Sequence, residues 1–220
     1  NILKEQAENA ITKVAAQFTR RITPFIMPAH VTALNLQPSD VESVLNANPG
    51  LFKGYGELAL YKDAYLGIKP DDESLRPFYD IAAKHDLVVM MHPDDGQREE
   101  VETILKDYPK VKFLFHGSEL GEYAAEIVAA YPNAFYTMDT QLFDIPYEHE
   151  SVNLFGDNTK ETFVAKFKRD HDQVLAGAIK TWENTIEKNP DKFLWGTDRA
   201  YVMHFDPEVG ALLDEIGREF

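Results

Sequence analysis

The chain has 220 residues, 44% of them hydrophobic and 27% charged, which predicts one folded domain over residues 1–220 and excludes a disordered or fibrous protein. Its formal net charge of −15, with the basic residues scattered, excludes nucleic acid as a partner, because a phosphate backbone would be repelled. The absence of cysteine excludes disulfides and leaves His and carboxylates as the ligands for any transition-metal site.

The predicted elements alternate between helices and strands along the chain. Apolar residues at three- and four-residue steps predict an opening helix over residues 1–18. A short strand over residues 22–27 follows, and then a helix over residues 41–45 that ends at Asn48-Pro49-Gly50. The same alternation continues, with strands predicted over residues 52–58, 87–91, 111–115, 134–138 and 193–195, and helices over residues 75–84, 98–107, 123–131, 160–188 and 207–216.

Strands that alternate with helices predict an α/β protein with a parallel sheet. The unbroken apolar run over residues 87–91 fits a strand that is covered on both faces. Six strands are predicted, whereas a closed barrel of strands and helices needs eight and typically about 250 residues. The chain starts with Asn1 and opens on a helix, so we expect two strands and the natural N-terminus to precede it, and residues 1–220 not to close a barrel alone.

Polar residues that can act on a metal or a proton stand at the ends of four predicted strands. They are Glu57 in Gly56-Glu57, His92 in Met91-His92-Pro93, His116 in Phe115-His116-Gly117, and Asp198 in Gly196-Thr197-Asp198. Active sites of barrel enzymes lie at the C-terminal ends of their strands. Alternation along each strand places His92 on the same face as Met90 and Val88, and His116 on the same face as Leu114 and Lys112. We therefore expect His92, His116 and Asp198 to face one cavity.

The order of these motifs resembles the amidohydrolase superfamily, particularly its branch with decarboxylases and lactone hydrolases. The resemblance implies a (β/α)8 TIM barrel of the metal-dependent hydrolase type, with about six of its eight strands in this chain. It implies that His92 binds the metal, and that Asp198 binds it and orients or deprotonates its water. His116 would complete a second metal site or act as general acid/base, and Glu57 would bridge metals. The family's first strand ends in His-x-His, a pair that residues 1–220 lack.

Each candidate also has a structural explanation. His92 and His116 could be buried histidines paired with backbone carbonyls, Asp198 could cap its turn, and Glu57 could form a buried ion pair with Lys53. Further residues are candidates for substrate binding: Asp139 after the strand over 134–138, His149 in the irregular segment over 141–158, and Tyr201 and His204 soon after Asp198.

The resemblance favours a metal-dependent hydrolase with a divalent metal, Zn²⁺ foremost, acting on an amide, lactone or ester of a small molecule. Such an ion lowers the pKa of bound water from 15.7 to about 7 and polarises a carbonyl group. A non-oxidative decarboxylase on the same scaffold is an alternative. So is a barrel without catalysis that serves as a binding or scaffold protein, because the His-x-His pair is missing. A third alternative is a metal-free glycosidase that uses Glu57 and Asp139.

The apolar runs also indicate the expected location of the protein. No run approaches the roughly 18 apolar residues of a membrane helix, so no membrane partner is expected. We expect a soluble protein with the cytoplasm as the favoured compartment, a small molecule as substrate, and homo-oligomerisation left open.

Overall fold

A computed structural model of the chain describes residues 2–11, 22–27, 36–61, 68–117, 120–138, 159–196 and 206–220. Its strands are β1 (Phe25–Ile26), β2 (Gly54–Ala59), β3 (Val88–His92), β4 (Lys112–Phe115), β5 (Ala134–Met138) and β6 (Phe193–Trp195). Its helices are α1 (Ile2–Asn9), α3 (Pro38–Ala47), α5 (Arg76–His85), α6 (Arg98–Asp107), α7 (Gly121–Ala130), α8 (Lys160–Lys188) and α9 (Pro207–Glu219), with a short 3₁₀ helix, η5 (Pro190–Lys192).

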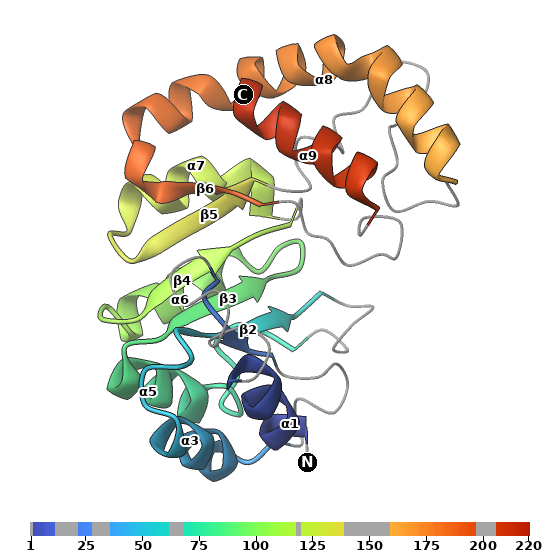
Figure 1. Cartoon of the computed structure of the whole chain (residues 1–220). Coiled ribbons are helices and arrows are strands. Elements are labelled where there is room, and N and C mark those ends of the chain that lie inside the picture. Colours follow the sequence, from blue (N-terminus) through green and yellow to red (C-terminus); the bar gives the residue numbers. More distant parts are fainter. Residues whose placement is uncertain are drawn as a thin grey trace. The chain divides into compact units, whose positions relative to one another are not determined.

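The strands form one sheet in sequence order, β1-β2-β3-β4-β5-β6, and the registers given by the paired residues are parallel. Helices alternate with these strands along the chain (Figure 1). The predicted α/β class is therefore confirmed, and the six strands of the described residues equal the predicted number. The predicted opening helix is present as α1, which spans Ile2–Asn9 and is followed by a π-helical pair, residues 10–11; the rest of that prediction, residues 12–18, lies outside the described residues.

The described residues group into two compact units. The first holds Asn1–Phe115 and Glu126–Phe135, and the second holds His116–Ala125 and Tyr136–Phe220. Each is described below by itself.

The β2, β3 and β4 strands of the first unit have two unlike faces. On the helix face, which carries Tyr55, Leu58, Val89, Met91, Phe113 and Phe115, every side chain is buried. Tyr55 stacks on Phe78 of α5 with ring centroids 5.2 Å apart, and Tyr79 of the same helix meets Phe113 edge-on at 5.5 Å. On the other face, called the site face here, Val88, Met90 and Leu114 are only half-buried and Lys112 is exposed. Alternate residues of the same strands thus form a core and a more open surface.

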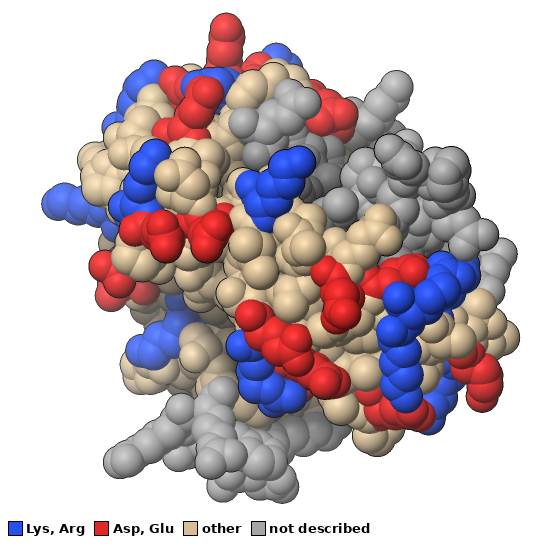
Figure 2. Space-filling model, turned by 90° about the horizontal axis from the view of Figure 1, so that it is seen from above, with Lys and Arg blue, Asp and Glu red and all other residues tan. Residues whose placement is uncertain are grey.

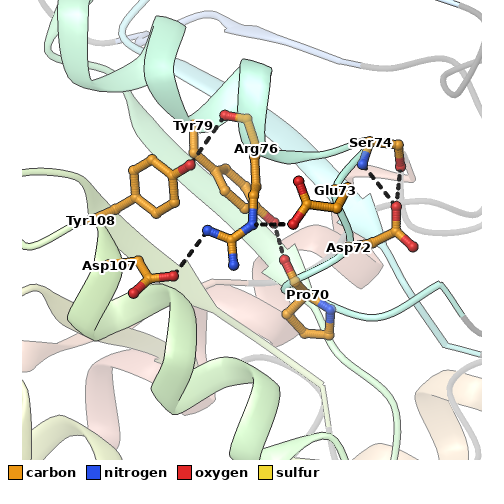
Figure 3. A network of polar contacts seen from close by, with 8 residues as sticks. All are labelled: Pro70, Asp72, Glu73, Ser74, Arg76, Tyr79, Asp107 and Tyr108. Carbon is orange, nitrogen blue, oxygen red and sulfur yellow. Dashed lines mark hydrogen bonds and ion pairs between the residues drawn. The ribbon is translucent and has the colours of Figure 1, made fainter.

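A polar network ties the start of α5 to the end of α6 (Figure 3). The Arg76 guanidinium donates to Asp107 at 2.9 Å and lies 3.3 Å from the Glu73 carboxylate. The buried hydroxyl of Tyr79 donates to the Pro70 carbonyl oxygen at 2.7 Å. Burial raises the pKa of Tyr79 well above its usual value, so this hydroxyl stays protonated and keeps its hydrogen bond. The network holds the helix against which the helix face of the sheet packs.

Two long helices form the core of the second unit. The Thr159 hydroxyl caps the start of α8, where it accepts from the Thr162 N–H, and the Asp206 carboxylate caps α9, where it accepts from the Glu208 N–H. The two helices share one apolar cluster of buried residues: Phe163, Phe167, Val174, Ala178, Val209, Leu212, Leu213 and Ile216. This shared cluster explains why an α8 of 29 residues persists without interruption.

The charged surface is mixed rather than divided by sign. On the face in Figure 2, Lys and Arg side chains are interspersed with Asp and Glu side chains. Arg98, for example, lies 3.0 Å from the Glu102 carboxylate and 2.6 Å from that of Glu126. None of the helices in the described parts of the chain is long and apolar enough to cross a bilayer.

Candidate metal centre

A β-bulge in β2 determines where Glu57 points. Tyr55 pairs with Val89, and the next paired residues are Leu58 and Met91, so two residues of β2, Gly56 and Glu57, stand opposite the single residue Met90. Strict alternation from Gly54, which pairs with Val88, would place Glu57 on the helix face. The extra residue reverses the alternation, and Glu57 joins the site face.

Gly56 makes this bulge feasible. Its φ is +126°, a conformation that L side chains rarely adopt, and a Cβ at this position would collide with the Met90 carbonyl oxygen. The glycine thus lets β2 approach β3 closely enough for Glu57 to stand next to His92.

His92 is the last residue of β3, and its side chain lies on the site face beside Glu57. Its Nδ1 is 3.5 Å from Glu57 Oε1, with 16% of the His92 side chain and 22% of the Glu57 side chain exposed. Across the strands, Ala59 pairs with His92, and the Leu60 N–H donates to the His92 carbonyl oxygen at 2.8 Å. The imidazole of His92 therefore faces the carboxylate of Glu57.

His116 directly follows Phe115, the last residue of β4, and only 1% of it is exposed. Glu57, His92 and His116 each offer one ligand atom, and these atoms all lie within 4.8 Å of one another. His92 is the last residue of β3 and His116 directly follows β4, as the strand-end pattern predicted, whereas Glu57 lies two residues before the last residue of β2. The structure thus brings together three of the four residues expected at the site.

The chemistry of the three donors, and the separation between the donor atoms of His92 and Glu57, fit a divalent cation. Two ligand atoms at about 2.1 Å from an ion in tetrahedral geometry are about 3.4 Å apart. The 3.5 Å between His92 Nδ1 and Glu57 Oε1 matches that separation and exceeds the usual length of a direct N–H···O hydrogen bond, at most about 3.2 Å. Two imidazoles and a carboxylate are the donors of catalytic zinc sites that leave a position open for water or substrate.

The buried ion pair between Glu57 and Lys53 is wrong. The Lys53 side chain is exposed to solvent, and the Glu57 carboxylate lies against His92 instead. The reason is the bulge, which moves Glu57 to the site face.

The other candidates lie outside the described residues: Asp198, Asp139, His149, Tyr201 and His204. The predicted meeting of Asp198 with His92 and His116, and the substrate contacts of the other four residues, therefore stay predictions.

Two residues at the site were missed by sequence reasoning. Gly56 forms the bulge, and Tyr61 places its ring 4.6 Å from the His92 ring, centroid to centroid, with a tilt of 53°. A glycine directly before a strand-end carboxylate is a signal for a bulge. No local signal identified Tyr61, because its contact depends on the register between β2 and β3.

Comparison with protein families matches residues 2–218 to the amidohydrolase family. The chain belongs to the amidohydrolase family. Among solved structures it is similar to an uncharacterised TIM-barrel protein from Bordetella bronchiseptica, with a TM-score of 0.52 and 15% identity over 97% of this chain and 64% of that chain. At this identity the similarity shows the fold alone, and the chain spans less than two thirds of that protein's length. A search of curated proteins finds no match.

Membership of the amidohydrolase family confirms the resemblance seen in the strand-end motifs, and the TIM-barrel neighbour agrees with the predicted fold class. The family gives the Glu57, His92 and His116 cluster its context, because amidohydrolases typically bind divalent metal at their active site.

Proposed function

We propose that the full-length protein is a metal-dependent hydrolase that cleaves an amide, lactone or ester of a small molecule. The observation that carries the proposal is the meeting of Glu57, His92 and His116, with ligand atoms within 4.8 Å of one another, at or near the C-terminal ends of three neighbouring strands in an amidohydrolase-family chain. Their partial or complete burial also supports it, because a site shielded from water strengthens electrostatic interactions with a substrate.

In this proposal Glu57, His92 and His116 hold the cation, with Asp198 as a further ligand. A divalent cation, Zn²⁺ foremost, would polarise the substrate carbonyl and make a water molecule more acidic. The Asp198 carboxylate would take the proton from the attacking water and pass it to the leaving group. The burial of His116, of which 1% is exposed, suits an imidazole that binds the ion or the substrate oxygen without competition from bulk water.

The experiment compares the full-length wild type with Asp198→Asn. An amide has nearly the same size as a carboxylate and can still form hydrogen bonds, but it cannot take a proton or supply a full negative charge. We therefore expect turnover of lactones, amides and esters to be abolished while the melting temperature is retained. Asp191→Asn is the matched control, because Asp191 lies exposed just before β6 in the same region of the sequence. Metal content, measured by plasma mass spectrometry, is followed in all three proteins.

The outcomes separate the alternatives. Release of carbon dioxide from carboxylated substrates, without hydrolysis of any ester or amide, would assign the decarboxylase reaction to the same metal site. A wild type without bound divalent metal, together with a silent Asp198→Asn substitution, would contradict the enzyme and favour a binding or scaffold protein. Glycoside hydrolysis that persists in the presence of chelators would favour the metal-free glycosidase, in which Asp139 is the second carboxylate.

A further inference from the structure

The ring of Tyr61 lies against the imidazole of His92. The two centroids are 4.6 Å apart and the rings are tilted by 53°. His92 meets Glu57 through Nδ1 along its edge, so a carboxylate and an aromatic ring contact different parts of the same imidazole. Both contacts restrict the orientation of the imidazole.

The register of the sheet accounts for this contact. Ala59 is the partner of His92, and beyond the bulge the alternation places Glu57, Ala59 and Tyr61 on the site face. Tyr61 is therefore the diagonal neighbour of His92, at a separation that aromatic side chains can bridge. Leu60, between Ala59 and Tyr61, is 1% exposed and donates its N–H to the His92 carbonyl oxygen, so the backbone before Tyr61 is anchored to β3.

We propose that Tyr61 is a positioning residue that fixes the plane of the His92 imidazole, so that Nδ1 stays on the Glu57 side of the site. The terminal torsion of a histidine side chain is broad, and only neighbouring groups select one ring orientation. Packing against Tyr61 supplies that selection before any cation binds. The inference rests on the proposed function, because a fixed orientation of the His92 imidazole matters only if His92 binds a metal ion.

The expected loss of Zn²⁺ affinity can be estimated from other metal sites. Groups that orient a metal-binding histidine typically change metal affinity by about 10- to 100-fold when they are removed. The contact with His92 is made by the aromatic ring, so Phe at position 61 should retain it and an aliphatic side chain should lose it. Loss of the ring is therefore expected to weaken zinc binding by about tenfold or more.

The test measures the affinity of the full-length, metal-free protein for Zn²⁺ by competition with a chromophoric chelator. Wild type, Tyr61→Leu, Tyr61→Met, Tyr61→Phe and His92→Ala are compared, and circular dichroism monitors folding. Tyr131→Leu is the matched control: Tyr131 is also half-buried and in the same unit, but its hydroxyl donates to Glu102. A second readout, the imidazole ¹⁵N chemical shifts of His92 in the metal-free protein, reports the ring environment without any cation.

We expect the Zn²⁺ dissociation constant to rise about tenfold in Tyr61→Leu and Tyr61→Met, and to stay within about twofold of wild type in Tyr61→Phe and Tyr131→Leu. The His92 signals should move in the two aliphatic variants. Unchanged affinity and unchanged His92 signals in these variants would overturn the inference while leaving the proposed function intact. A wild type that binds no Zn²⁺, or binds it equally well after His92→Ala, would overturn the proposed function and the inference with it.

Discussion

The helix face and the site face of β2, β3 and β4 differ although the same strands form both. On the helix face, Val89, Met91, Phe113 and Phe115 are fully buried against one another and against α5. On the site face, the Glu57 and His92 side chains are 22% and 16% exposed and contact each other through polar atoms. Substitutions on the helix face should therefore lower the stability of the fold, and substitutions on the site face should change metal binding.

The largest effect is expected on the helix face, from Phe113→Ala. Phe113 is fully buried, and its ring meets the ring of Tyr79, so its truncation leaves a cavity between the sheet and α5. The free energy of unfolding should fall by roughly 3–5 kcal/mol, measured by urea denaturation. The control, Lys112→Ala, removes an exposed side chain from the adjacent position on the site face and should change stability by less than about 0.5 kcal/mol. Equal losses in the two variants would contradict the division between the faces.

An intermediate effect is expected from Gly56→Ala, which should alter both stability and the site. The new Cβ would collide with the Met90 carbonyl oxygen, and the φ of +126° at position 56 is strained for alanine. We therefore expect the free energy of unfolding to fall by roughly 3 kcal/mol. We also expect weaker Zn²⁺ binding, because relief of the collision displaces Glu57 from His92.

Gly96→Ala is the control for the glycine substitution. Gly96 also has a positive φ, +76°, but a Cβ there meets no atom within 4 Å. It should cost only roughly 1–2 kcal/mol and leave Zn²⁺ affinity unchanged. Identical behaviour of the two alanine variants in denaturation and in metal titration would show that the bulge does not position Glu57.

The smallest effect is expected in the turn before α5, where Ser74 is exposed. Ser74 donates to the Asp72 carboxylate through its hydroxyl at 2.6 Å and through its backbone N–H at 2.8 Å, and these hydrogen bonds lower the pKa of Asp72. A lowered pKa in the folded state contributes stability above the unfolded value of about 3.9, and this contribution is lost as the pH falls through the folded pKa.

Ser74→Ala removes the larger of the two causes of that lowered pKa. Urea midpoints measured from pH 7 to pH 2.5 should therefore fall less steeply at the acid end in Ser74→Ala than in wild type. In the Asp72→Asn background, adding Ser74→Ala should leave the pH dependence of the urea midpoint unchanged. A steeper acid-side loss in Ser74→Ala would show that this pair does not stabilise the charged carboxylate.

Local sequence patterns determined the elements of this protein. The predicted bounds of α6, α8, β5 and β6 agree with the structure, because apolar periodicity over one element reports which side of it is buried. The strand-end positions of His92 and His116 were also visible in the sequence, since a polar residue at the end of an apolar strand marks the edge where the C-terminal ends of parallel strands meet.

The tertiary structure alone decided which way Glu57 and Tyr61 face. Strict alternation from Gly54 would have turned both residues toward the helices. Gly56 permits a bulge, but the sequence does not show that the register changes opposite Met90. Strand register depends on the backbone of the neighbouring strand, where the Met90 carbonyl oxygen leaves space only for Gly56. Periodicity describes one segment, whereas the meeting of Glu57, Tyr61 and His92 is a property of two strands paired together.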